Sequence, residues 1–383
     1  MSRPAHVSAR RILERVAALP DIRPLRIFPL LLPMWRVEIK TEVRESQPYE
    51  LFDQFLSRAI ARAGLLDVSQ LATFFGVDRA LVDRVITFLE TIGHVRRSGD
   101  ALTLTGIGQQ SVADGCRYVE KKGRQVLYFD GFTSEPMPAT HYEGTEWIDD
   151  IELTLNADGT RFRVVTGSRS FNFEALERLA SRPDREEFNL PGSVSSIKPI
   201  DVGSAFLPAY VVECTERLLV FVKAMDGPDE YLADLVSTVL PDVLAAEDRV
   251  DDMRTWQDWL RARGLENIRP ERLPNNILRA SLPAKEYGRR ISWWQLGSFE
   301  VHRASFLQLW CDDAEARQHA VLDRVGRIVK TRVIRDADEL GRRLSDLAGQ
   351  LQVTTPGIAD LRRFAREEND ESLLSMVEDL LTT

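Results

Sequence analysis

The sequence predicts a mixed α+β protein, and three observations lead to this class. Helical periodicity and strand-type alternation both occur, but in separate stretches of the chain. The strand-type stretches come in pairs around short polar turns, which is typical of antiparallel hairpins. At 383 residues, the chain is long enough for two or three domains with their own cores. We therefore expect mixed α+β architecture with antiparallel hairpins and a helical C-terminal tail.

Composition narrows the possible partners. The formal net charge is −9, with 44% hydrophobic and 28% charged residues, which is ordinary globular composition. This balance argues against a generally basic nucleic-acid coat, although one local basic face remains compatible with it. Cys116, Cys214 and Cys311 lie far apart, so the chain has neither a disulfide framework nor a zinc-knuckle pattern. We predict no metal, no cofactor and a reducing, cytoplasmic location.

Residues 1–45 are expected to form an N-terminal arm. Residues 8–19 place Ile12, Val16 and Leu19 on one helical face. From Trp35 to Val43, apolar and charged residues alternate as in a half-buried strand. The longest apolar run, RIFPLLLPMW, is too short for a membrane span and contains two prolines. We expect an arm that packs on another domain or a partner, and no membrane contact.

Residues 46–115 carry the most specific pattern in the chain. Helical spacing runs through LFDQFLSRAIARAG, and Ser69 and Gly76 are expected to begin and end a short second helix. Asp78 is expected to cap a third helix, RALVDRVITFLETI, with Leu81 and Phe88 among its core residues. Next, HVRRSGDALTLTG predicts two short strands around the turn at 98–100. A short closing helix follows.

This order of three helices and a hairpin resembles the winged helix-turn-helix superfamily over residues 49–115. Such domains place the third helix in the major groove and the wing beside the phosphate backbone. The resemblance implies contacts from the third helix and from the wing: Arg79, Asp83, Arg84, Thr87 and Thr91 on the helix, and Arg96, Arg97 and Ser98 on the wing.

The charge of residues 49–115 weighs against tight DNA binding. This stretch has six arginines, no lysine and eight acidic residues, which gives a net charge of −2. Phosphate contacts supply much of the affinity for DNA, so an acidic module starts at a disadvantage. Winged helices also contact proteins. The sequence therefore leaves two partners open, double-stranded DNA and other protein subunits, and it does not determine the oligomeric state.

Residues 116–335 are expected to form a mixed α+β domain. Its first segment contains the densest basic cluster of the chain, Lys121, Lys122 and Arg124, interpreted as a solvated turn or as an extension of a backbone-binding face. A tight turn follows Asp130. A winged-helix segment followed by a basic linker and an FDG-type hairpin is similar to parts of bacterial phage-defence proteins.

Further hairpins are predicted around Asn156–Gly159 and near 214–217, with tryptophans in core strands at 293–310. A strand, RVIRD, is predicted at 332–336. Residues 336–383 form the C-terminal helices, whose basic faces are expected at Arg342, Arg343, Arg362, Arg363 and Arg366.

Two constellations are weighed as divalent-metal nuclease sites. Asp21, Glu38 and Lys40 match the PD…ExK pattern, in which acids hold the metal and a lysine helps activate water. Asp201, Glu213 and Lys223 form a looser trio. Charges on the solvent faces of strands explain both sets more simply.

Three functions follow as hypotheses. The first is a non-enzymatic, nucleic-acid-associated regulator or accessory subunit of a bacterial DNA-directed system, with phage defence as one such system. The second is a protein–protein adaptor in a multi-subunit complex. The third is a divalent-metal nuclease.

Overall fold

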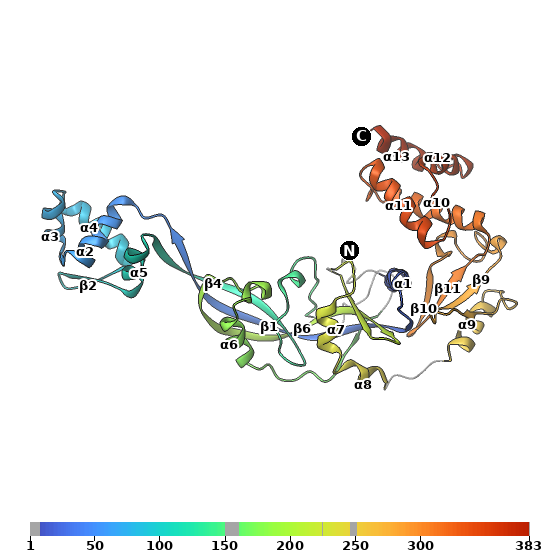
Figure 1. Cartoon of the computed structure of the whole chain (residues 1–383), viewed down its shortest axis with the longest axis horizontal. Coiled ribbons are helices and arrows are strands. Elements are labelled where there is room, and N and C mark those ends of the chain that lie inside the picture. The colour runs from blue at the N-terminus through green and yellow to red at the C-terminus, as the bar shows by residue number, and fades with distance from the viewer. Residues whose placement is uncertain (1–7, 150–160, 224, 246–250, 383) are drawn as a thin grey trace. The chain divides into compact units, whose positions relative to one another are not determined.

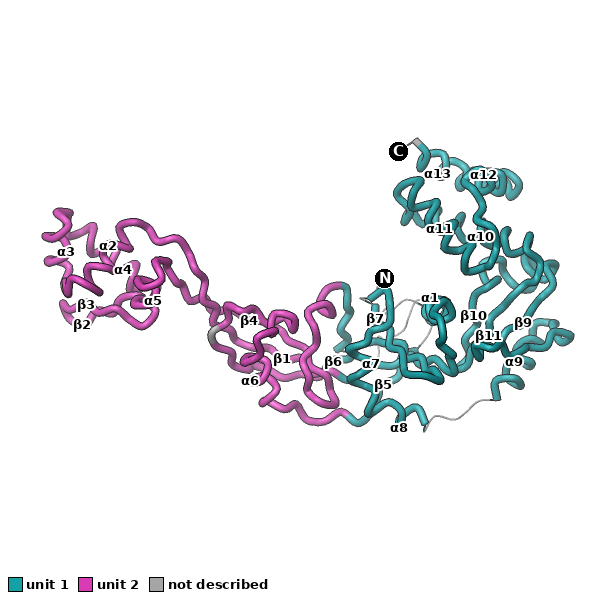
Figure 2. The backbone as a smooth tube through the Cα atoms, in the orientation of Figure 1, with its two compact units in different colours: residues 1–33, 144–167, 206–383 teal, residues 34–143, 168–205 magenta. Residues whose placement is uncertain are grey.

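The structure is a computed structural model that describes residues 8–149, 161–223, 225–245 and 251–382. The chain forms two compact units (Figure 2). Unit 1 comprises Met1–Pro33, Gly144–Gly167 and Phe206–Thr383, and unit 2 comprises Met34–Glu143 and Ser168–Ala205. Helices and largely antiparallel strands occur in both, and the chain ends in helices, so the predicted α+β class is confirmed. The hairpin predicted around Asn156–Gly159 lies outside the described residues.

Strand β1 (Pro24–Gln47) organises unit 2 through its C-terminal half. This half pairs antiparallel with β4 (Arg117–Asp130), from Met34 opposite Asp130 to Gln47 opposite Arg117. The basic cluster at 121–124 therefore lies within a strand, and its interpretation as a turn is wrong. Residues 48–116 leave the ladder at Gln47 and return at Arg117. The strand pairing thus brings the two ends of this segment together.

We call residues 48–116 the inserted module, and it contains the predicted helices and hairpin (Figure 1). Its core is built from Leu56, Leu71, Val82, Ile86 and Leu102, all fully buried. The elements are α2 (Leu51–Arg62), α3 (Val68–Phe75), α4 (Arg79–Thr91), β2 (Val95–Ser98), β3 (Ala101–Leu104) and α5 (Gly106–Asp114).

Local signals set the helix ends of the module. The Asp78 carboxylate accepts a hydrogen bond from Ala80 N at 2.7 Å, as expected for an N-cap. Gly76 ends α3 in the left-handed conformation, with φ 65°. For α3, however, the cap is Asp67, which accepts from Gln70 N at 2.8 Å. The prediction of Ser69 as its cap is therefore wrong by two residues.

The remainder of unit 2 packs around the β1–β4 ladder. The Asp130 carboxylate is buried and accepts hydrogen bonds from Phe132 N, Thr133 N and Thr133 Oγ1, which builds the predicted tight turn. Burial raises the pKa of Asp130. Gln125 Nε2 donates to the Asn189 carbonyl. The other elements are α6 (Glu174–Ser181), the short 3-10 helices η1 (Ala139–His141) and η3 (Arg185–Phe188), and the first part of β6 (Val194–Cys214).

Unit 1 contains two sets of strands and the helical tail (Figure 1). One set includes β5 (Arg163–Val164), parallel to β1 at Leu30 and Leu31, and β7 (Leu218–Val222), antiparallel to β6. Along the whole sheet, the strand order is β4-β1-β6-β7, with β5 beside β1. Helices α1 (Ala9–Ala17), α7 (Glu230–Val236), α8 (Leu240–Ala245) and α9 (Asp252–Arg261) accompany these strands in the chain.

The second sheet of unit 1 has the strand order β10-β11-β9-β8. Its strands are β8 (Glu271–Arg272), β9 (Leu278–Ser281), β10 (Phe299–His302) and β11 (Ser305–Trp310), and β9 and β11 run parallel. Trp310 lies in this sheet as predicted, whereas Trp293 and Trp294 lie in a short 3-10 helix, η5 (Trp293–Gln295), rather than in a strand.

The tail consists of four helices: α10 (Ala314–Lys330), α11 (Ala337–Gln350), α12 (Ile358–Glu367) and α13 (Glu371–Thr382). The strand predicted at 332–336 is absent from this described part, where the chain turns between α10 and α11. Within the described ranges, none of the helices combines the length and apolar character that a bilayer crossing requires.

Candidate nucleic-acid interface

Helix α4 presents most of its predicted contact residues to solvent. Arg79, Arg84, Thr87 and Thr91 are exposed. The two threonine hydroxyls donate to carbonyls one turn earlier, Thr87 Oγ1 to Asp83 O and Thr91 Oγ1 to Thr87 O, both at 2.8 Å. Their hydrogens are thus used within the helix. Among the predicted contact residues of α4, Arg79 and Arg84 therefore keep side-chain donors that could contact phosphate.

Arg97 of the wing folds back onto α4 instead of facing outward. Its Nη2 atom lies 3.0 Å from Asp83 Oδ1, and its Nε atom lies 3.3 Å from Glu90 Oε2. One guanidinium therefore pairs with both acidic side chains that stand on α4. The net charge of the module is unchanged by this pairing, but the single positive charge of Arg97 offsets part of the negative charge on the surface of α4.

Three other predicted arginines keep their charge uncompensated. In the described part of the chain, the side chains of Arg79, Arg84 and Arg96 have no ion pair and no hydrogen bond, and all three are exposed. Arg79 and Arg84 stand on α4, and Arg96 stands on β2 of the wing. Ser98, at the wing tip, is also exposed. Free positive charge therefore remains on both the helix and the wing.

The basic residues of β4 do not form one cluster. Side chains alternate between the two faces of a strand, so Lys121 lies on one face of the ladder and Lys122 and Arg124 on the other. Lys121 Nζ pairs with Glu45 Oε2 at 2.7 Å, and this contact lowers the pKa of Glu45. Arg124 pairs with Glu38 at 3.3 Å. Lys122 stands opposite Glu42. The compact basic face expected from the sequence is thus split and partly neutralised.

The tail arginines are likewise partly engaged. Arg362 pairs with Glu378 at 2.9 Å, and Arg363 pairs with Asp360 at 3.2 Å. Asp370, one turn after Arg366, is bound instead by Lys330. Arg342 and Arg343 are exposed on α11.

The structure pairs members of both nuclease trios with residues outside the trios. In the first trio, Glu38 is paired with Arg124. Glu213 pairs with Arg26, and Lys223 pairs with Glu146. Among the residues that the structure describes, no three His, Cys, Asp or Glu side chains are grouped closely enough to hold a metal ion.

Large apolar side chains on the surface of the module are a feature that sequence periodicity missed. Leu51 is 69% exposed and Phe74 is 63% exposed. Leu81 and Phe88, predicted to face the core, are also exposed, so that prediction is wrong. The exposed large hydrophobic residues of the module are Leu51, Phe55, Leu66, Phe74, Leu81 and Phe88.

The aromatic residues of this surface are connected. The Phe74 ring contacts Phe75 with centroids 5.0 Å apart, and Phe75 contacts Phe52 at 6.1 Å. Leu51 and Phe55 stand one helical turn apart on α2, beside Phe52. Exposed apolar groups of this size and proximity are more typical of a binding surface than of a free one.

No protein-family model matches the chain, and no curated protein or solved structure is detectably similar to it. The resemblance to winged-helix domains therefore rests on the order of elements within the inserted module and stays a prediction.

Proposed function

We propose that the inserted module binds double-stranded DNA, with α4 in the major groove and the β2–β3 wing along the backbone. The observation that supports this most directly is the double ion pair of Arg97 with Asp83 and Glu90. It partly compensates the two acids of α4 and leaves Arg79, Arg84 and Arg96 available for phosphates. Arginine is well suited to this role because its planar fork can donate two parallel hydrogen bonds.

Such a module fits a non-enzymatic regulator or an accessory subunit of a bacterial DNA-directed system, with phage defence as one such system. The three cysteines are free thiols, two of them buried. A reducing cytoplasm is consistent with thiols in this state, and we propose that location.

Replacing Arg79, Arg84 and Arg96 together with alanine should weaken binding to a random-sequence duplex of about two helical turns. At low salt we expect about a 30-fold loss of affinity, taking about 0.7 kcal/mol for each exposed contact. Three phosphate contacts also predict a slope of about −3 for log affinity against log salt. The triple variant should flatten this slope. Fluorescence anisotropy of a labelled duplex measures both quantities.

The matched control is Arg62→Ala, because Arg62 is an exposed arginine on α2 outside the proposed contact face. It removes one positive charge, as each substitution of the triple variant does, but it removes no proposed contact. Binding should therefore change little. The proposal fails if the wild-type protein does not bind the duplex at low salt, or if Arg62→Ala weakens binding as much per arginine as the triple variant does.

A second candidate function, a protein–protein adaptor, is favoured by the exposed apolar side chains on the module. Replacing Leu51 and Phe74 with serine should release protein partners that co-purify with the wild-type chain from its native host. The control is Ile200→Ser, an exposed apolar residue of unit 2 outside the module. Quantitative mass spectrometry compares the three preparations, and a partner set that is unchanged in the double variant contradicts the adaptor role.

A further inference from the structure

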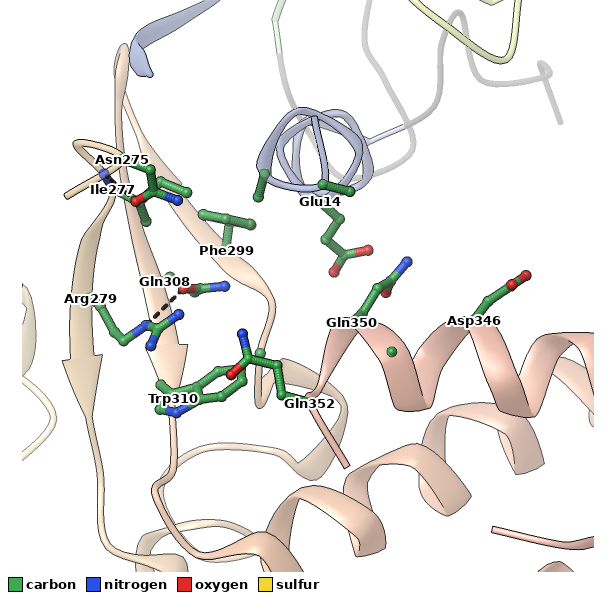
Figure 3. A pocket seen from close by; sticks show the side chains of 14 residues that line it. Glu14, Asn275, Ile277, Arg279, Phe299, Gln308, Trp310, Asp346, Gln350 and Gln352 are labelled. Carbon is green, nitrogen blue, oxygen red and sulfur yellow. Dashed lines mark hydrogen bonds between the residues drawn. The ribbon is translucent and has the colours of Figure 1, made fainter. Parts of the chain in front are cut away.

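Unit 1 contains a cleft of about 510 Å³ that the proposed DNA contact does not use. Its walls come from α1, from the second sheet and from the C-terminal end of α11 (Figure 3). This volume falls within the usual range of about 300–1,000 Å³ for small-molecule sites. In Figure 3, Arg279 and Gln308 stand on the strand wall, and Gln350 and Asp346 stand across from them on the α11 side. The cleft therefore has a strand wall and a helical wall of different chemistry.

Strand register places the residues of the strand wall in one row. Gln308 on β11 is the partner of Arg279 on the parallel strand β9, and it is also opposite Phe299 on β10. Side chains at paired positions of neighbouring strands share a face of the sheet. Trp310, two residues after Gln308, shares that face too. This face of the sheet thus presents the Arg279 guanidinium and the Gln308 amide beside two aromatic side chains, Phe299 and Trp310.

The hydrogen bond between Arg279 and Gln308 determines which groups face the cleft. Arg279 Nε donates to Gln308 Oε1 at 2.9 Å. Because a guanidinium can only donate, the amide must accept through its oxygen and direct its NH₂ group elsewhere. In the described residues, no protein group accepts from Gln308 Nε2 or from either Nη atom of Arg279. Gln308 is only 8% exposed. The strand wall therefore offers hydrogen-bond donors without acceptors of their own.

Arg279 is partly buried and packs against Trp310. Its guanidinium carbon lies 4.4 Å from the centroid of the Trp310 ring. Burial lowers the pKa of Arg279, while Glu271 and Asp312 favour its charged form from beyond ion-pair distance. Within the described chain, no carboxylate forms an ion pair with it. Glu271 on β8 stands at the position paired with Arg279, yet it forms no ion pair with it. A partly desolvated guanidinium whose two Nη groups have no acceptor among the described residues is well prepared to bind an anion.

The acidic groups of the cleft lie away from this donor pair. Glu14 Oε1 accepts from Ser298 Oγ at 2.7 Å and lies 3.8 Å from Arg324 Nη1, so its charge is compensated. Asp346 is exposed on α11. The amides of Gln350 and Gln352 also line the cleft and can both donate and accept hydrogen bonds. The anionic part of a ligand would therefore contact the strand wall, and its neutral polar part would contact the helical wall.

We propose that this cleft binds a small polar molecule that carries a phosphate or carboxylate group. The oxyanion lies against Arg279 and Gln308. The remainder of the ligand lies toward α11, where Asp346 and the glutamine amides accept its hydrogen-bond donors. This site is independent of the proposed DNA contact, whose residues all belong to unit 2.

The sharpest test is Gln308→Glu, which changes one amide into a carboxylate of the same shape. The new carboxylate pairs with Arg279, and the free NH₂ donor of Gln308 is lost. The protein then supplies its own anion at the site. Because the two side chains have the same shape, the packing of the sheet is kept. Isothermal titration calorimetry with adenosine monophosphate, inorganic phosphate and citrate covers both oxyanion chemistries. We expect the wild-type protein to bind at least one probe below about 10 mM, and Gln308→Glu to bind it at least about tenfold more weakly.

Two further variants make the result decisive. Arg279→Met keeps an unbranched stem over Trp310 but removes the charge, and it should lose binding as well. Gln318→Glu makes the same chemical change on α10, outside the cleft lining, and should bind like the wild type. Thermal unfolding of each variant checks folding. Binding of phosphate compounds alone, or of citrate alone, identifies the anion class. No binding of any probe, or equal binding by wild type and Gln308→Glu, overturns the proposal.

Discussion

Replacing Arg324 with alanine is expected to lower the free energy of unfolding of unit 1 by about 3 kcal/mol. Arg324 stands on α10 with only 9% of its side chain exposed. Its Nε and Nη2 atoms donate to the carbonyls of Trp294 and Leu296, and its Nη1 atom lies 3.8 Å from Glu14 Oε1. Burial lowers the pKa of this arginine. Its removal leaves two carbonyls without a donor and leaves Glu14 of α1 without its counter-charge, which is why a large loss is expected.

Urea unfolding followed by tryptophan fluorescence measures this loss. Six of the seven tryptophans belong to unit 1, so the signal reports mainly on that unit. The control is Arg327→Ala on the same helix, where a 60% exposed arginine pairs with Asp323. An exposed pair contributes little, and the control should lose no more than about 0.5 kcal/mol. Similar losses in the two variants would show that Arg324 does not connect α1, η5 and α10 as described.

Replacing Gly108 with alanine is expected to destabilise the inserted module by about 3 kcal/mol, through overpacking. A Cβ atom at this position would lie 2.2 Å from the His94 carbonyl oxygen and 3.0 Å from its carbonyl carbon. His94 cannot move away easily. Its ring Nε2 atom lies 2.6 Å from the Tyr118 carbonyl oxygen, and its own carbonyl accepts a hydrogen bond from Thr105 N at 2.9 Å. Helix α5 must therefore shift, or the contacts of His94 must break.

Gly106→Ala is the matched control, because an added Cβ there meets no atom within 4 Å. Alanine favours the helix over glycine, so this variant should be neutral or more stable by about 0.5 kcal/mol. Hydrogen exchange of the backbone amides in α5 and β2 measures the local stability of the module directly. Faster exchange is expected for Gly108→Ala alone. Unchanged protection in that variant would mean that the close packing of α5 on His94 is not required.

The sequence predicted the elements of the module well because their signals are local. Apolar spacing defines a helix within one stretch of chain. Gly76 ends α3 through its left-handed backbone, and the Asp78 carboxylate caps the start of α4. The inward faces were predicted less well. Leu81 and Phe88 match the helical spacing of Val82 and Leu89, yet the actual core stripe runs through Val82, Ile86 and Leu89. Periodicity defines a helix but does not decide which of two adjacent stripes is covered.

Strand pairing was largely beyond prediction. The alternation of apolar and charged residues indicated a strand only from Trp35 to Val43. In the structure β1 starts at Pro24 and includes Pro29 and Pro33 as well. Its partner β4 is separated from it by the whole inserted module. Such pairing depends on contacts between residues far apart in sequence, and a basic run such as Lys121–Lys122 gives no sign of the ladder that divides its side chains.

By itself, the sequence determined the α+β class, the three helices and hairpin of the module, and the total charge available to them. Tertiary structure alone decided which charges are free. Arg97 reaches Asp83 and Glu90 because the wing packs against α4, and Arg279 meets Gln308 because two parallel strands bring residues 29 positions apart side by side. The physical reason is that the ability of a charged side chain to bind a partner depends on the charges beside it and on its burial. Both are set by register and packing rather than by residue order.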